Sequence, residues 1–165
     1  ELSKKTKESN NWYKTKKRIT KLYLYKRNYI KDTLDKATTE LVKNYDVVFM
    51  EDLSIKELVQ QQKSKVIRRK IIESSLYMIR EMLTYKCKMY NKRLIFVERL
   101  FPSSKMCSVC GSIHDPRSSE TFICPVCGLS IDRDLNAAIN IYKRGMAKYL
   151  NMYSTEASFG RKPTK

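Results

Sequence analysis

Apolar residues recur every three or four positions along residues 12–42, and this spacing predicts one long amphipathic helix, or two helices with a break. The apolar positions are Ile19, Leu22, Tyr23, Ile30, Leu34, Ala37 and Leu41. A second helical pattern extends over about residues 66–90. Its apolar face consists of Ile72, Leu76, Ile79, Leu83, Cys87 and Tyr90. Because Cys87 belongs to this face, we predict a small core residue there and not a reactive thiol.

Two short apolar runs predict buried strands at residues 46–53 and 93–98, since both runs are rich in β-branched and aromatic residues. The first run ends in the acidic pair Glu51 and Asp52. Ligands of open α/β sheets bind at the carboxyl ends of strands, so this pair is a candidate metal site. The alternative is an acidic strand end that meets only solvent or caps the next segment. That segment, residues 54–64, is polar and is expected to form a loop or lid with weak helical character.

Two C-x-x-C pairs separated by 13 residues predict a zinc site with four thiolate ligands. The cysteines are Cys107, Cys110, Cys124 and Cys127. Four thiolates complete the tetrahedral coordination of Zn2+, so the metal would be structural and not catalytic. Two disulfides or four buried thiols are the alternatives. Gly111 and Gly128 follow the pairs, where the backbone often needs a positive φ, and His114 between the pairs is expected at the surface.

A helix is predicted directly after the second cysteine pair, because a polar start precedes apolar residues at helical spacing. Its first residues include Asp132 and Asp134. Acidic residues at a helix start often serve only to cap the helix or to meet its dipole, and that alternative stays open on the residues alone. Gly145 is expected to punctuate the chain after the basic end of this helix.

Lysine and arginine number 34 against 17 aspartate and glutamate residues, which gives a formal net charge of +17. Such an excess favours a polyanionic partner, and nucleic acid before a membrane surface. No apolar run is long enough for a membrane span, and no signal-peptide pattern is present. Thiolate ligation suits a reducing compartment, so we expect a cytoplasmic or nucleoid-associated protein. The candidate nucleic-acid-binding residues are Lys14, Lys17, Arg18, Lys21, Arg68 and Arg69, with a merely solvated basic face as the alternative.

Three features follow one another along the chain: the strand VVFMEDLS, the cysteine segment PSSKMCSVCG…FICPVCG, and the helix DRDLNAAINI. In this combination the sequence resembles the C-terminal half of the OrfB/TnpB family, the transposon-encoded RNA-guided nucleases related to type V CRISPR effectors. The resemblance covers nearly the whole chain and weakens in the last residues. It implies an α/β fold, namely a partial RNase H-like (RuvC-type) domain with long helices and an inserted zinc ribbon.

The resemblance also implies a reaction, the two-metal hydrolysis of DNA phosphodiesters directed by a guide RNA. The family's site uses three carboxylates to bind two Mg2+ ions. Glu51 matches the Glu of the family's E-D-L motif, and Asp134 matches the Asp of its D-x-N motif. Asp132 is the weaker candidate and would act as a neighbour of the metal ligands. Carboxylate oxygens suit Mg2+, and two such ions activate water and stabilise the leaving oxygen.

The sequence departs from the family at its beginning, where the first catalytic Asp of a G-I-D type motif has no counterpart. We therefore expect these residues to be a piece of a longer protein. We expect this piece alone not to cut DNA. The alternative is a non-catalytic zinc-ribbon remnant or regulator that binds nucleic acid. The expected divisions are a RuvC-like portion at 1–100, the zinc ribbon at 101–131, the final helix at 132–150 and a disordered tail at 151–165.

Overall fold

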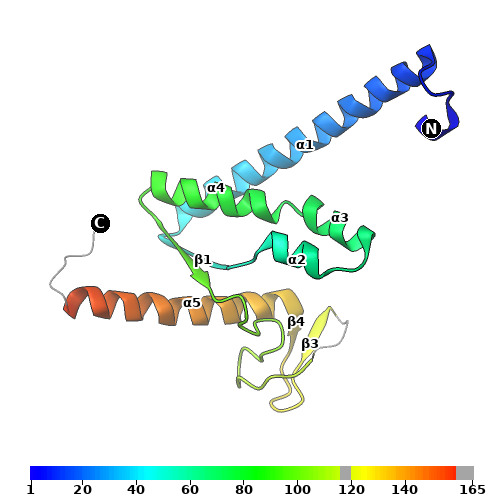
Figure 1. Cartoon of the computed structure of the whole chain (residues 1–165). Coiled ribbons are helices and arrows are strands. Elements are labelled where there is room, and N and C mark those ends of the chain that lie inside the picture. Colours follow the sequence, from blue (N-terminus) through cyan, green and yellow to red (C-terminus); the bar gives the residue numbers. More distant parts are fainter. Residues whose placement is uncertain (116–119, 159–165) are drawn as a thin grey trace.

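Two parallel strands lie at the centre of the chain in the computed structural model, which describes residues 1–115 and 120–158 (Figure 1). Strand β1 (Val47–Glu51) pairs with β2 (Arg93–Val97), and Glu51 lies opposite Val97. Both predicted strands are therefore confirmed. Because the pair is parallel, both carboxyl ends lie at one edge, as in sheets that bind ligands there.

Helices cover both faces of this strand pair. On one face, Val48 and Met50 pack against a core of Val42, Leu83 and Cys87, which comes from α1 (Asn10–Asn44) and α4 (Leu76–Met89). Cys87 is only 2% exposed, and burial raises the pKa of its thiol, which confirms the predicted core role. On the other face, α5 (Arg133–Ser158) covers the strands and brings the ring of Tyr142 within 5.7 Å of the Phe49 ring.

Helix α1 is one unbroken element of 35 residues, of which only Thr38 and Val42 are buried. Ser9 caps its start, because the Ser9 side chain accepts a hydrogen bond from the Trp12 N–H. The C-terminal third of α1 packs on α4, whereas its N-terminal part projects away from the rest of the chain (Figure 1). Its predicted apolar face is thus largely exposed, with Leu22 at 61% and Tyr23 at 67%.

The predicted helix over residues 66–90 is divided in the structure. Helix α3 (Lys65–Glu73) ends before Ser74, and α4 begins after Ser75. Ser75 has a φ of 60°, in the left-handed region that no helix interior adopts, and the Ser74 hydroxyl donates to the Ile71 carbonyl at 2.6 Å. The polar segment before α3 contains one short helix, α2 (Ile55–Gln61), beside the carboxyl end of β1.

A small second unit lies between β2 and α5. Its antiparallel strands β3 (Thr121–Ile123) and β4 (Ser130–Asp132) enclose a separate core of Phe122, Cys107 and Cys124, with Leu129 and Ile131 packed against it. This unit contacts the start of α5 (Figure 1). The core is small, so a metal at the cysteines would add much of its stability.

Helix α5 corrects two predictions about the end of the chain. It continues through Gly145 to Ser158, so Gly145 does not punctuate the chain and residues 151–158 are helical, where a disordered tail was expected. Gly145 is buried against β1, and a Cβ there would lie 2.7 Å from Phe49 Cγ. A glycine is therefore needed for close packing. The remainder of the expected tail, 159–165, lies outside the described residues.

None of the helices in the described residues is long and apolar enough to cross a membrane.

Candidate functional site

The four predicted zinc ligands converge on one point, with all four sulfur atoms within 4.8 Å of one another. The sulfurs of Cys107 and Cys127 are 3.6 Å apart, and so are those of Cys110 and Cys124. Four sulfurs bound at about 2.3 Å to one tetrahedral Zn2+ would be about 3.8 Å apart. The side chains present therefore fit a zinc ion. The structure records all five cysteines as free, so it contains no disulfide between the pairs.

The two C-x-x-C-G turns have the same backbone hydrogen bonds. In the first, Gly111 N–H donates to the Cys107 carbonyl at 3.0 Å; in the second, Gly128 N–H donates to the Cys124 carbonyl at 3.0 Å. Gly111 and Gly128 have φ values of 75° and 73°, which confirms the prediction of positive φ at both positions. A side chain there would strain the turn that aims each sulfur pair inward.

The thiols of this cluster do not ionise equally. Burial raises the pKa of Cys124, but hydrogen bonds from the Ser112 hydroxyl and from backbone N–H groups outweigh it and lower this pKa to about 5. The Leu129 backbone lowers the pKa of Cys127, but burial and the three neighbouring thiols raise it to about 12. Crowded sulfurs thus resist collecting negative charge, and a bound dication would remove that resistance.

The position of His114 differs from the expected one. Its ring stacks on Phe122 with centroids 5.3 Å apart, and its Nε2 is buried and has no hydrogen-bond partner in the part of the chain that the structure describes. His114 is therefore half-buried, with its ring packed against Phe122 of the small core. It lies outside the four-thiol group, in agreement with the prediction that it is not a ligand.

The two acidic residues at the end of β1 have different surroundings. Asp52 accepts a hydrogen bond from Arg80 at 2.6 Å, and Arg80 lowers the pKa of this carboxyl. Asp52 also lies 3.8 Å from the guanidinium of Arg99. Glu51 has no ion pair among the described residues, and burial raises its pKa. Asp52 thus anchors the loop after β1, whereas the Glu51 carboxylate stays available.

The acidic residues at the start of α5 differ in the same way. Asp132 Oδ1 accepts a hydrogen bond from the Leu135 N–H at 2.9 Å and caps the helix. Asp134, the second residue of the helix, has a side chain that is 90% exposed and forms a long ion-pair contact with Arg133 at 3.8 Å. That Asp134 is a better metal ligand than Asp132 stays a prediction.

Helix α5 runs antiparallel to the strands. Its tyrosines 149 and 153 lie beside Arg93 at the start of β2, whereas Arg144 pairs with Glu98 just beyond the end of β2. The first turns of α5 therefore extend past the edge at which β1 and β2 end (Figure 1). That edge is also where Glu51 lies.

By the periodicity of the strand and of the helix, Glu51 and Asp134 lie on the sides of β1 and α5 that face each other. Glu51 lies on the same strand face as Phe49, and the Phe49 ring contacts Tyr142 of α5. Gly145 of α5 lies close to Phe49, and Asp134 lies on the same helix face as Gly145. By the rise per residue of a helix and of a strand, Asp134 lies about 10 Å beyond Glu51 along the helix. Two side chains and two metal ions about 4 Å apart can span that interval.

A cleft of about 460 Å³ opens at the carboxyl end of β1. Its walls come from β1, α2, α4 and the segment after β2. It is lined by Met50, Glu51, Asp52, Leu53, Ser54, Ile55, Lys56, Leu76, Tyr77, Arg80 and Arg99. The predicted acidic residue of β1 thus lies in an accessible hollow of the structure.

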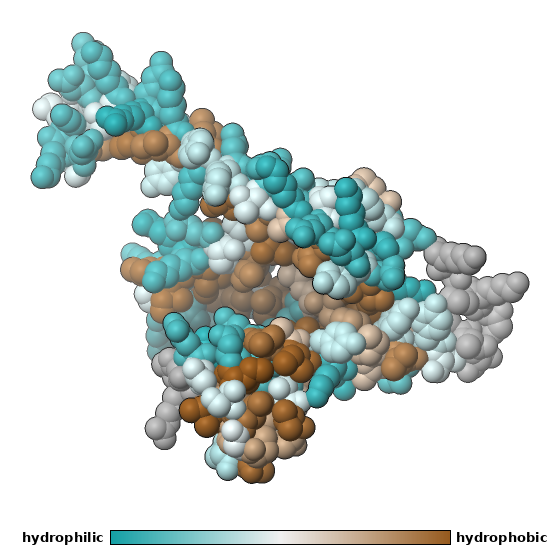
Figure 2. All heavy atoms as spheres, turned by 180° about the vertical axis from the view of Figure 1, so that it is seen from behind, coloured by the Kyte–Doolittle hydropathy of each residue, from teal (hydrophilic) through white to brown (hydrophobic). Residues whose placement is uncertain are grey.

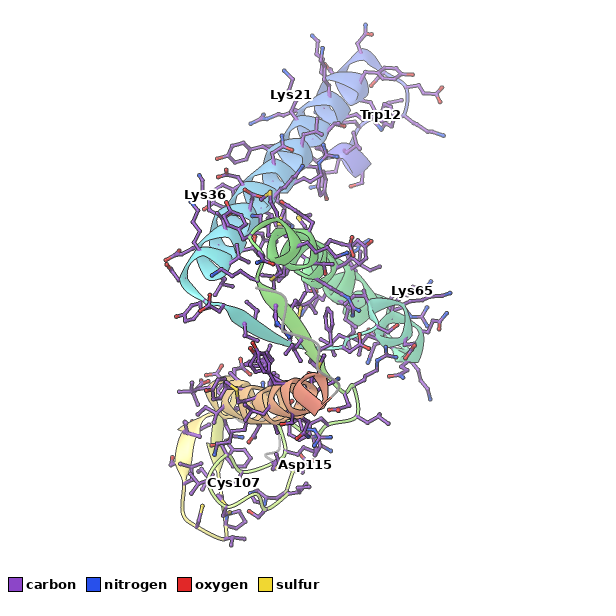
Figure 3. All side chains as sticks on the ribbon, turned by 90° about the vertical axis from the view of Figure 1, so that its left-hand side faces the viewer. Trp12, Lys21, Lys36, Lys65, Cys107 and Asp115 are labelled. Carbon is purple, nitrogen blue, oxygen red and sulfur yellow. The ribbon has the colours of Figure 1, made fainter. Side chains whose placement is uncertain are left out.

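The candidate nucleic-acid-binding residues are exposed, but they lie on two separate helices. The projecting part of α1 carries Lys14, Lys17, Arg18 and Lys21, and Figure 3 labels Trp12 and Lys21 on this part of the helix. Arg68 and Arg69 lie on α3, and Arg68 donates to the Gln62 carbonyl at 2.5 Å. Figure 2 shows mostly hydrophilic residues over the projecting end of α1.

Two asparagines near Asp134 were not singled out from the sequence. Asn136 and Asn140 are 0% and 1% exposed, and their amides bond the backbone of the first cysteine turn. Their spacing of four places them on one helix face, and an asparagine at an apolar position of a helix is the signal that could have found them.

Two family models match consecutive parts of the chain. Residues 1–62 match OrfB_IS605, described as a probable transposase, and residues 77–141 match the Cas12f1-like TNB domain. The cysteine cluster and the first part of α5 lie within the second match. Glu51 lies within the first match, and the four cysteines and Asp134 lie within the second.

Several named relatives are similar over most of this chain. A "Putative RNA-guided DNA endonuclease" of Streptomyces pristinaespiralis is 34% identical over 149 residues, which is 89% of this chain and 36% of that protein. "TnpB-like protein L79" of Acanthamoeba polyphaga mimivirus is 32% identical, over 86% of this chain and 28% of that protein. This chain spans about a third of the length of the relatives that it matches.

A solved structure has a similar fold. A chain of the cryo-EM structure of the Cas12f1-sgRNA-target DNA complex superimposes with a TM-score of 0.56 and 23% sequence identity. The match covers 77% of this chain and 37% of that chain. The mixed helix and sheet arrangement is therefore shared with that protein.

Proposed function

Since the chain carries OrfB/TnpB-family sequence in both of its halves, we propose that it contributes the RuvC-like and zinc-ribbon portion of a transposon-associated RNA-guided DNA endonuclease. The fold of this portion would be RNase H-like, with β1 and β2 as two of its parallel strands. The zinc ribbon would hold a structural Zn2+, and the acidic edge would hold catalytic Mg2+.

One observation carries the catalytic part of the proposal. Asp52 accepts a hydrogen bond from Arg80 at 2.6 Å and Asp132 caps the helix, whereas Glu51 has no ion pair among the described residues. Asp134 has only a long, exposed ion-pair contact with its neighbour Arg133 at 3.8 Å. In the proposed site, Glu51 at a strand end and Asp134 at a helix start would contribute to the same metal centre. Such placement leaves their carboxylate oxygens available to a hard cation.

The chain's own residues would prepare this site in two ways. Partial burial raises the pKa of Glu51, so its carboxylate has lost part of its hydration and gains from a cation. The ion pairs of Asp52 with Arg80 and Arg99 fix the loop beside it. Mg2+, when bound, supplies water activation and stabilisation of the leaving oxygen of a phosphodiester.

The proposed partners are DNA and a guide RNA. The net charge of +17 and the exposed basic residues of α1 and α3 support a polyanionic partner. The name of the Streptomyces pristinaespiralis relative, "Putative RNA-guided DNA endonuclease", supports the same partners.

Cleavage of target DNA in Mg2+ by the complete protein with its bound RNA tests the proposal. Glu51→Gln and Asp134→Asn should each reduce cleavage to background, because each removes a charged metal ligand while keeping the size of the side chain. Glu40→Gln, at an exposed position of α1, is the matched control and should cleave like the wild type. Full activity of either site variant would contradict the proposed roles.

A second candidate function is nucleic-acid binding without cleavage. Among the side chains that the structure describes, the four cysteines are the only group of three or more potential metal ligands, and this group includes neither Glu51 nor Asp134. We expect these 165 residues alone to bind DNA or RNA and not to cut. Mg2+-dependent cleavage by this polypeptide, abolished by Glu51→Gln, would contradict that expectation.

A further inference from the structure

Two buried asparagines of α5 join the first cysteine turn to the helix. Asn136 accepts a hydrogen bond from the Ser108 N–H at 2.9 Å and donates to the Met106 carbonyl at 2.8 Å. Asn140 donates to the same Met106 carbonyl at 2.6 Å and to the Ser103 carbonyl at 2.9 Å. Met106 and Ser108 are the immediate neighbours of Cys107. We call Asn136 and Asn140 the asparagine clamp.

The clamp is fully buried, which makes its hydrogen bonds costly to lose. An amide without partners in such a place is destabilising, whereas a bonded one is tolerated. Lys143, one turn further along, adds a bond from its ammonium to the Ser108 carbonyl at 2.6 Å. The backbone on both sides of Cys107 is thus held by one face of α5.

The same backbone is also held by the cysteine cluster. Cys107 is 1% exposed, and its sulfur lies 3.6 Å from that of Cys127 in the second turn. Without a cation no bond joins the four sulfurs, which are only in contact with one another. The first turn would then loosen, and the clamp amides would lose partners that they cannot replace with water in a buried place.

We infer that the asparagine clamp couples metal binding at the four cysteines to the order of the first turns of α5. Asp134 lies in those turns, two residues before Asn136. Asn136 and Asn140 are therefore positioning residues: the metal at the cysteines holds the helix start, and the helix start holds the Asp134 carboxylate toward the edge of β1. The consequence for Asp134 rests on the proposed function, but the coupling itself does not.

Hydrogen exchange of the backbone amides of this chain tests the coupling. In the wild type, removal of zinc with a chelator should speed exchange at residues 137–141 as well as in the cysteine turns. In Asn136→Leu and Asn140→Leu the cysteine turns should still respond to zinc, because their core of Phe122, Cys107 and Cys124 is intact. Residues 137–141 should exchange fast at all zinc levels in these variants. Asn28→Leu, at an exposed position of α1, is the control.

Linkage makes a second measurement available. If zinc stabilises the ordered start of α5 through the clamp, the ordered helix start must strengthen zinc binding by the same factor. Loss of the clamp must therefore weaken zinc binding. Loss of two buried hydrogen bonds in Asn136→Leu should weaken zinc binding about tenfold, measured by competition with a chelator of known affinity. Asn28→Leu should leave it unchanged. Asn140→Asp, which keeps the size of the side chain but places a carboxylate against two carbonyls, should weaken zinc binding as well.

Two results would overturn the inference. One is exchange at residues 137–141 that does not depend on zinc in the wild type; the other is unchanged zinc affinity and unchanged coupling in the clamp variants. Slow exchange around Val42, Leu83 and Cys87 shows that a variant is folded, because that core is separate. Asp134→Asn should keep the coupling. If it also keeps cleavage, the proposed role of Asp134 fails while the inference stands.

Discussion

Acidic residues that are close neighbours in the sequence have different surroundings in this protein. Glu51 and Asp52 are adjacent, yet only Asp52 pairs with Arg80, and Asp132 caps the helix in which Asp134 stays exposed. Alternation along a strand and the geometry of a helix start produce these differences. At the residue scale, therefore, the type of side chain identifies the candidates and the local backbone separates them.

Gly145 shows what a single residue decides in packing. Gly145→Ala should destabilise the fold by about 1–3 kcal/mol, because the added methyl overlaps Phe49 in a filled interface. Helix propensity alone predicts the opposite sign, a gain of about 1 kcal/mol. Urea unfolding measures the difference, with Ala147→Gly at an exposed position of α5 as the control for propensity. A stabilised Gly145→Ala variant would show that Phe49 moves aside at no cost.

The Asp35 carboxylate gives a pH-dependent contribution at the contact of α1 and α4. The buried ammonium of Lys86 lies 2.9 Å from Asp35 and keeps the pKa of this carboxyl below its usual range. A lowered folded-state pKa adds stability above the unfolded-state pKa of about 3.9, and that stability is lost as the pH falls through the folded value.

Urea unfolding of the wild type and of Asp35→Asn between pH 7 and pH 2.5 measures this contribution. The wild type should be more stable at neutral pH, and the difference should shrink on acidification. In a Lys86→Met background the same substitution should have a smaller effect. An equal difference at all pH values would exclude the ionised pair as the cause.

At the scale of elements, the lysine that holds α1 is fully surrounded by acceptors. Lys86 is 3% exposed and donates to the Asp35 carbonyl at 2.5 Å and to the hydroxyls of Thr38 and Thr39 at 2.9 and 2.7 Å. A buried ammonium is stable only with such partners. This group of contacts, with Val42, fixes the angle at which α1 leaves the body of the protein.

The cysteine unit should behave as a separate element when its metal is removed. The core around Phe122 and the core around Val42 share no residue. Chelation should therefore unfold residues 107–130 and release one Zn2+ per chain, while the contact of α1 and α4 persists. Metal analysis of protein purified under reducing conditions, together with hydrogen exchange, measures both. A preparation free of zinc with a folded cysteine unit would contradict the site.

At the scale of the whole molecule, the projecting helix α1 carries positive charge away from the acidic edge. The first 22 residues of α1, positions 10–31, contain no acidic residue. Positive charge that is spread along a projecting helix can follow a nucleic-acid backbone. The two regions lie on opposite sides of the contact between α1 and α4 (Figure 1).

Neutral substitutions at Lys14, Lys17, Arg18 and Lys21 should weaken nucleic-acid binding regardless of sequence. The slope of log affinity against log salt should become shallower by an amount that corresponds to up to about four phosphate contacts, because binding releases about one counterion fewer for each contact that is lost. Lys36→Gln is the control on the same helix, since Lys36 is already paired with Asp32 at 2.7 Å. Unchanged affinity and slope in the fourfold variant would mean that this face is only solvated. A titration at three salt concentrations measures the slope.

The sequence by itself determined the local features of this protein. The two strands follow from short β-branched runs, and the paired turns of the four thiols follow from C-x-x-C-G spacing, because these patterns depend only on neighbours along the chain. The break at Ser75, the packing role of Gly145 and the asparagine clamp were decided by the tertiary structure. Each depends on a partner at least 28 residues away or on a backbone angle that composition does not fix. The difference between Glu51 and Asp52 has the same origin. Arg80, 28 positions after Asp52, donates a hydrogen bond to the Asp52 carboxylate and not to that of Glu51.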